Sequence, residues 1–195
     1  MADAALAILV IDENPERAAV IEEGLREAGH HAIRVISDMR NLLRQIVDSA
    51  PDVIVIDLEN PNRDVLEEMF QVSRSVPRPV AMFVDQSDRA SIEAAIEAGV
   101  SAYVVDGLRK ERIRPVVEMA ISRHRAYRKL RDELDRTKQA LEDRIVIERA
   151  KGVLMKSKGL SEDDAHAALR AAAMRESRRL AEVARAVLTA SKLLG

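Results

Sequence analysis

The sequence contains no cysteine and no tryptophan, and only two tyrosines and two phenylalanines. Without cysteine, neither a disulfide framework nor a thiolate metal site can form, which favours a cytoplasmic protein. Long apolar runs are also missing, since none approaches the roughly 20 residues that a membrane-spanning helix needs. The N-terminal residues lack the basic region of a signal peptide. We therefore expect a protein that is neither exported nor bound to a membrane.

The sequence also has few features that would support catalysis. It shows no glycine-rich phosphate loop, no zinc-ligand spacing and no recognisable pairing of a nucleophile with a base. The four histidines are scattered, and each is expected to be a surface or boundary residue: His30, His31, His124 and His166. The sequence therefore predicts a protein that is not an enzyme.

The net charge of -2 conceals a strong division of charge along the chain. Residues 1–108 contain 9 Lys and Arg against 20 Asp and Glu, a net charge of -11. Residues 109–195 contain 22 against 13, a net charge of +9. Since Lys and Arg neutralise phosphates and release their counterions, the basic part favours a polyanionic partner. A solvated helical surface is the simpler alternative.

Short apolar runs alternate with amphipathic segments in the first 110 residues. Runs that predict strands occupy residues 5–11, 31–36, 53–56, 80–84 and 102–105. Helices are expected to begin at Asn14 with Pro15, at Ser37 or Asp38, after Pro61, and near Ser87. This alternation predicts an α/β domain over residues 1–110, with a five-stranded parallel sheet and right-handed crossovers.

Acidic residues follow two of the predicted strands. Asp12 and Glu13 come directly after the first strand, and Asp57 follows the third. Because the carboxyl ends of parallel strands meet at one edge of a sheet, these three carboxylates are expected to lie together. Oxygen ligands of this kind suit Mg²⁺, so the pattern predicts a magnesium site at this edge of the sheet.

These positions resemble the receiver domain of response regulators, over residues 5–123. Asp12 and Glu13 match the acidic pair, Asp57 the phospho-accepting aspartate, and Tyr103 the aromatic switch residue. The resemblance implies a flavodoxin-like fold. However, Val84 stands where the family has a hydroxyl, and Asp106 where it has a lysine that holds the phosphoryl group. We therefore expect a pseudo-receiver that is regulated by protein contact, with phosphorylation of Asp57 as the alternative.

Residues 111–143 predict a long polar helix that begins near Arg112, because Pro115 is tolerated in a first turn. Residues that recur at alternating intervals of three and four are Ala120, Arg123, Tyr127, Leu130, Leu134, Thr137, Leu141 and Arg144. This spacing predicts a parallel coiled coil joining two copies of the chain into a homodimer, with Tyr127, Leu130, Leu134 and Leu141 as contacts. Packing of the helix onto its own receiver is the alternative.

Residues 144–195 predict a small all-α domain. Gly159 ends one helix, Ser161 caps the next, and a break follows Glu176. The matching strings are Ile147 to Met155, Gly159 to Glu162, Ala165, Leu169-Arg170, Ala173-Met174 and Leu180 to Ala184. They resemble the three-helix ANTAR RNA-binding domain of transcription antiterminators. A helical dimerisation bundle is the alternative.

The resemblance implies that this domain binds structured leader RNA hairpins. It has no aromatic side chain, so stacking on bases would depend on arginine, and phosphate contacts on lysine. The candidate RNA-binding residues are Arg149, Lys151, Lys156, Lys158, Arg170, Arg175, Arg178 and Arg179. Arg144 or Arg149 could instead form salt bridges between subunits. Gly152, which costs a helix interior about 1 kcal/mol relative to alanine, suggests close approach of RNA or of another backbone.

The stretches at residues 57–61 and 83–88 resemble the AmiR/NasT group of response regulators, and most of all its nitrate- and nitrite-responsive antiterminators. That resemblance implies control of nitrate and nitrite assimilation genes. It also implies a partner protein that senses a small ligand, of the nitrate/nitrite-sensor type, and holds the regulator inactive. A DNA-binding response regulator and a signalling adaptor that binds no nucleic acid are the competing interpretations.

Overall fold

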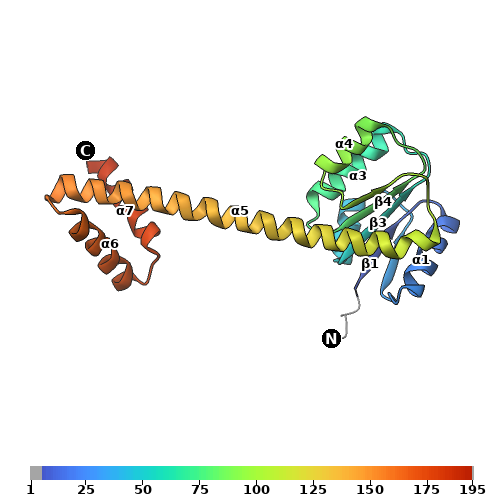
Figure 1. The fold of residues 1–195 in the computed structure, drawn as a ribbon, viewed down its shortest axis with the longest axis horizontal. Coiled ribbons are helices and arrows are strands. Elements are labelled where there is room, and N and C mark those ends of the chain that lie inside the picture. Colours follow the sequence, from blue (N-terminus) through green and yellow to red (C-terminus); the bar gives the residue numbers. More distant parts are fainter. Residues whose placement is uncertain (1–5, 195) are drawn as a thin grey trace. The chain divides into compact units, whose positions relative to one another are not determined.

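The computed structural model describes residues 6–194 and divides into two compact units, Met1–Arg128 and Lys129–Gly195 (Figure 1). The elements of the first unit are β1 (Ile8–Ile11), α1 (Pro15–Glu27), β2 (Ile33–Ile36), α2 (Leu42–Ser49), β3 (Val53–Leu58), α3 (Arg63–Ser75), β4 (Val80–Val84), α4 (Arg89–Glu97) and β5 (Ala102–Val104). Helix α5 (Lys110–Lys158) begins in this unit and continues into the second, which also contains α6 (Glu162–Glu176) and α7 (Leu180–Leu194). None of the described helices is long and apolar enough to cross a membrane.

The five strands form one parallel sheet in the order β2-β1-β3-β4-β5. This confirms the predicted receiver fold. Ile11 at the end of β1 pairs with Ile56 in β3. The residues that follow them, Asp12 and Asp57, therefore lie beside each other at the carboxyl edge of the sheet.

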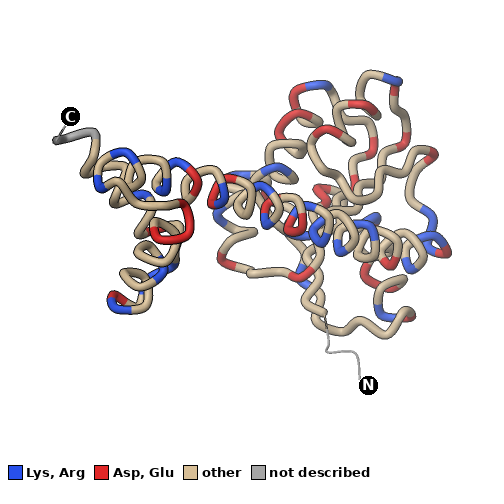
Figure 2. The backbone as a smooth tube through the Cα atoms, turned by 60° about the vertical axis from the view of Figure 1, so that its left-hand side comes forward, with Lys and Arg blue, Asp and Glu red and all other residues tan. Residues whose placement is uncertain are grey.

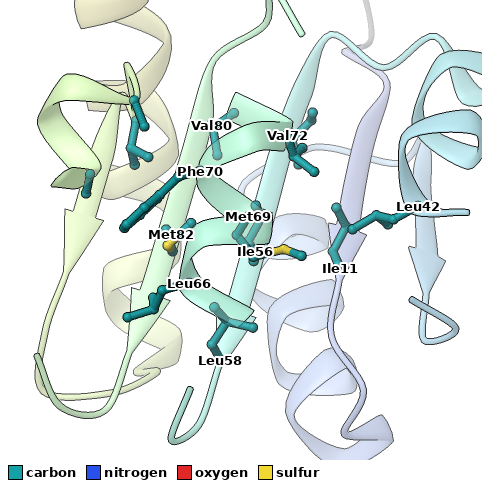
Figure 3. Close-up of a cluster of buried hydrophobic side chains, with 14 of the residues drawn as sticks. Ile11, Leu42, Ile56, Leu58, Leu66, Met69, Phe70, Val72, Val80 and Met82 are labelled. Carbon is teal, nitrogen blue, oxygen red and sulfur yellow. The ribbon is translucent and has the colours of Figure 1, made fainter. Parts of the chain in front are cut away.

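Helices cover both faces of the sheet. Helices α2, α3 and α4 enclose one apolar cluster, which includes Leu42, Leu66 and Met69 (Figure 3). Helix α1 and the first turns of α5 enclose the other cluster, through residues such as Leu25 and Ile113. Every residue of β1, β3 and β4 is buried, because each of these strands has helices on both sides.

Several helices begin at other residues than the sequence predicts. Helix α2 was expected to start at Ser37 or Asp38 but begins at Leu42. The Asp38 carboxylate instead accepts a hydrogen bond from the Arg40 amide and forms an ion pair with its guanidinium. Asp38 thus stabilises a turn before the helix, as aspartates often do. The first residue of the predicted strand 5–11 lies outside the described residues.

Helix α5 begins two residues before the expected Arg112, so Pro115 lies in its second turn and not in the first. Pro115 is exposed, whereas its neighbour Val116 is buried against the sheet. The end of α5 at Lys158 and the cap of α6 agree with the sequence, because the Ser161 hydroxyl accepts a hydrogen bond from the Asp164 amide. The core of the second unit is small and contains Ala150, Leu169, Ala173, Val183 and Ala184.

Candidate functional site

The start of α1 fixes one side of the acidic edge. The Asn14 side chain accepts hydrogen bonds from the amides of Glu16 and Arg17, and Pro15 occupies the first helical position. Since only three residues separate the end of β1 from the start of α1, Arg17 lies in the first turn above the carboxyl edge of the sheet. The local sequence therefore positions the Arg17 guanidinium beside the acidic residues at the carboxyl edge of the sheet.

Arg17 binds two carboxylates at once. Its Nε lies 2.6 Å from Asp57 Oδ2 and its Nη2 lies 2.9 Å from Asp57 Oδ1, a forked pair. Nη2 also donates to Asp85 Oδ1 at 3.0 Å, and Nη1 to Asp85 Oδ2 at 3.3 Å. These contacts, with the hydrogen bond to Asp57 first, raise the pKa of Arg17 further above its ordinary value. The Asp57 side chain is fully buried by this arrangement.

Asp12 is the buried acid that Arg17 does not contact in this way. The Asp12 residue is 3% exposed, and its Oδ1 accepts a hydrogen bond of 2.8 Å from the Asn14 amide. Its Oδ2 has no hydrogen-bond partner among the described residues. Burial raises the pKa of Asp12 to about 6, the Asn14 amide opposes that rise, and the neighbouring charge of Asp57 adds to it.

The expected magnesium site of Asp12, Glu13 and Asp57 does not form in this arrangement. Glu13 is exposed, and both oxygens of Asp57 accept hydrogen bonds from Arg17. Over residues 6–194 no three His, Cys, Asp or Glu side chains come together as a set that could hold a metal ion. Magnesium is usually held by one or two carboxylates while water completes its shell, and Asp12 Oδ2 is the oxygen of this buried pair that has no hydrogen-bond partner among residues 6–194. The residues as arranged therefore do not fit this ion.

The predicted switch residues lie around this edge in different settings. Val84 is buried in the sheet, and the Tyr103 hydroxyl lies 2.9 Å from the Ser87 hydroxyl. Burial raises the pKa of Tyr103. Asp106 is exposed and has a positive φ of 81°, so it is not the acid that joins the cluster. The carboxylate that contacts Arg17 beside Asp57 is that of Asp85.

Gly107 allows the chain to approach Asp85 closely. Its φ is 74°, and a Cβ added to it would lie 2.8 Å from Asp85 Oδ1. Its amide donates a hydrogen bond to the Val84 carbonyl at 3.1 Å. The turn after β5 is thus held against the end of β4, where it limits the space available to Asp85.

Arg17 and Asp85 are the site residues that the motifs did not reveal. The feature of the sequence that could have pointed to a basic partner was the excess of acids at one sheet edge, because buried carboxylates require a nearby cation. Arg17 is the first basic residue of the chain and follows Glu13 by four positions. Its partners lie 40 and 68 residues away, a separation that no local pattern specifies.

The second unit contains the candidate RNA-binding residues (Figure 2). Those that are exposed are Arg149, Lys156, Lys158, Arg170, Arg175, Arg178 and Arg179. Arg178 is paired with Glu176 and Glu182. Arg149 and Lys156 are seven residues apart in α5, so they lie on the same side of the helix. The exposed candidate residues therefore lie on α5, on α6 and in the turn between α6 and α7.

Lys151 is the exception among these residues. It is 8% exposed, and its Nζ lies 2.7 Å from Glu162 Oε1 and 2.9 Å from Glu148 Oε2. The hydrogen bond to Glu162, followed by that to Glu148, raises the pKa of Lys151. The expected contact of Lys151 with RNA phosphate is therefore not supported, because its ammonium joins α5 to the start of α6.

Two features of α5 remain without a partner in the described chain. The predicted dimer contacts are largely exposed: Tyr127 by 60%, Leu130 by 66%, Leu134 by 52% and Leu141 by 59%. An added Cβ at Gly152 would meet no atom within 4 Å. Close packing against a helix of the same chain therefore does not explain Gly152.

Comparison with known proteins finds a matching domain family for each of the two units. The response regulator receiver domain matches residues 8–118, and the ANTAR domain matches residues 135–188. The transcriptional regulatory protein PdtaR of Mycobacterium tuberculosis (strain H37Rv) is 29% identical over 96% of this chain and 92% of its own length. A nitrate regulatory protein of Klebsiella oxytoca is 47% identical, but over only 33% of this chain and 16% of its own.

Solved structures support the fold of the first unit. The signal receiver domain of a modulated diguanylate cyclase from Desulfovibrio desulfuricans G20 has a TM-score of 0.54 at 17% identity, covering 64% of this chain and 99% of that one. NtrX from Brucella abortus, in complex with ADP, has a TM-score of 0.54 at 24% identity, covering 69% of this chain and 30% of that one. With the matches of both domains, the chain belongs to the response regulators that join a receiver domain to an ANTAR domain.

Proposed function

We propose that this protein is a cytoplasmic transcription antitermination regulator, not an enzyme, and that it binds structured leader RNA hairpins through its ANTAR domain. The observation that carries the proposal is the set of exposed basic residues on α5, on α6 and in the turn before α7, in a domain of that family. Similar proteins are described as a transcriptional regulatory protein and a nitrate regulatory protein, which supports a role in transcription. Genes of nitrate and nitrite assimilation are the proposed targets.

Phosphate and base contacts are divided between two kinds of side chain in this proposal. Lys156 and Lys158 at the end of α5 contact phosphates, because an ammonium acts as a point charge. Arg170 and Arg175 in α6 contact loop bases, because a planar guanidinium can both stack and form forked hydrogen bonds. Arg178 contributes less, since its charge is already paired within the domain.

A homodimer through α5 presents two such domains to RNA. The leucines of the seam are exposed in one chain, and a second copy would bury them. Gly152 supports the same proposal, because its open surface allows a backbone or a nucleic acid to come close. Regulation comes from a sensor protein of the nitrate/nitrite type that holds the receiver, since Asp57 is buried under Arg17.

The experiment is binding of the full chain to a panel of hairpin RNAs and to duplex DNA at two salt concentrations. Lys156→Ala should weaken all hairpins alike and reduce the salt slope by about 1. Arg170→Ala should cost about 1–3 kcal/mol on the cognate loop only, by analogy with forked contacts to bases in duplexes. Arg44→Ala, an exposed position in α2, is the matched control and should change nothing.

Two outcomes would support the competing functions. Stronger binding to duplex DNA than to any hairpin would favour a DNA-binding regulator. Absence of binding to both would favour an adaptor that contacts only proteins. Equal losses on cognate and scrambled loops for Arg170→Ala would mean that this surface holds only the RNA backbone.

A further inference from the structure

The carboxyl edge of the receiver sheet gathers three acids around one guanidinium. Asp57 and Asp85 each present both oxygens to Arg17, over distances of 2.6 to 3.3 Å. Asp12 lies beside Asp57 with an unpartnered oxygen in a buried position. Carboxylates at this density repel one another and lose hydration, so a positive charge among them is required.

A receiver that lacks Arg17 would have to obtain that positive charge from solution. A guanidinium is always ionised, donates from several nitrogens in one plane, and is weakly hydrated, so it can take this place permanently. A divalent ion would have to remove the guanidinium from both oxygens of Asp57 before it could bind. The side chain of Arg17 is only 20% exposed, which limits its ability to turn into solvent.

We propose that Arg17 is a built-in cation that replaces a divalent metal ion in the acidic pocket, so that this receiver is stable and closed without metal. The pocket is then a metal-exclusion site, and Asp57 is covered in the resting protein by the two N–H groups that bind its oxygens. Phosphorylation would require Arg17 to leave first. This inference does not depend on RNA binding, because it concerns the receiver alone.

The proposal is tested by titrating the full-length protein with MgCl₂ and MnCl₂. Binding is measured by isothermal titration calorimetry, and by thermal unfolding against NaCl of equal ionic strength. The wild-type protein should show no saturable binding and no metal-dependent shift of melting temperature. Arg17→Gln removes the charge but keeps a polar side chain, and should bind either metal at least tenfold more tightly than the wild type.

Arg26→Gln is the matched control, because it removes a basic side chain from the last turn of the same helix. Arg26 is exposed and pairs only with Glu22 among the described residues, so this variant should behave as the wild type. Saturable submillimolar Mg²⁺ binding by the wild-type protein would overturn the proposal, even if Arg17→Gln fails to fold. A folded Arg17→Gln variant with no gain in metal affinity would also overturn it.

Discussion

Replacing Asp12 by asparagine is expected to stabilise the receiver at neutral pH. The asparagine oxygen can still accept the hydrogen bond from the Asn14 amide that Asp12 Oδ1 accepts now. Its NH₂ group would replace the unpartnered Oδ2 and could donate to Asp57. The variant therefore removes a buried charge and leaves the geometry of the site unchanged.

The magnitude follows from the raised pKa of Asp12, which is about 6 in the folded protein against an ordinary value of 3.8. Well below pH 3.8 the carboxyl is protonated in both states, so it costs the folded protein nothing. As the pH rises, the unfolded chain loses this proton first, and stability falls until the pH passes about 6. The full cost above that pH is about 3 kcal/mol, and roughly half of it applies at pH 5.

The measurement is urea unfolding of the full-length protein at pH 5 and pH 8, followed by tyrosine fluorescence. Asp12→Asn should gain about 3 kcal/mol at pH 8 and roughly half of that at pH 5. Asp48→Asn is the control, because Asp48 is exposed and lies 3.9 Å from its nearest basic partner. An equal gain at both pH values, or a loss of stability at pH 8, would refute the argument.

Three further outcomes are expected. Substituting both Leu130 and Leu134 by aspartate should convert dimers to monomers and abolish RNA binding; an unchanged mass by light scattering would rule out the seam. Asp57→Asn should change reporter antitermination little, and acetyl phosphate should label the wild type weakly; strong labelling with strong activation would show a working phospho-switch. Lys151→Met should lower the melting temperature of the ANTAR domain, since its ammonium holds α6. Unlike Lys156→Ala, it should leave the salt slope of RNA binding unchanged.

The sequence by itself determined the order and type of most elements. Buried parallel strands are continuously apolar, so residues 80–84 matched β4 to the residue. Helix starts were found where a side chain caps its own helix, as Asn14 and Ser161 do. The start of α2 was missed because Asp38 binds the neighbouring Arg40, a competition between two local hydrogen bonds.

The residues that follow the strands could also be placed from sequence, because parallel strands bring their carboxyl ends to one edge. The basic residue that neutralises those acids could not be identified from the sequence in the same way. Arg17 reaches Asp57 and Asp85 only after three strands have paired, and Lys151 reaches Glu162 only after the chain has turned back at Gly159. A lysine or arginine in the sequence can contact either RNA or an acid of its own chain, and only its burial in the folded protein shows which of the two it contacts. The tertiary structure alone therefore decided which charges are internal and which are available to a partner, because ion pairing depends on distances that local periodicity does not fix.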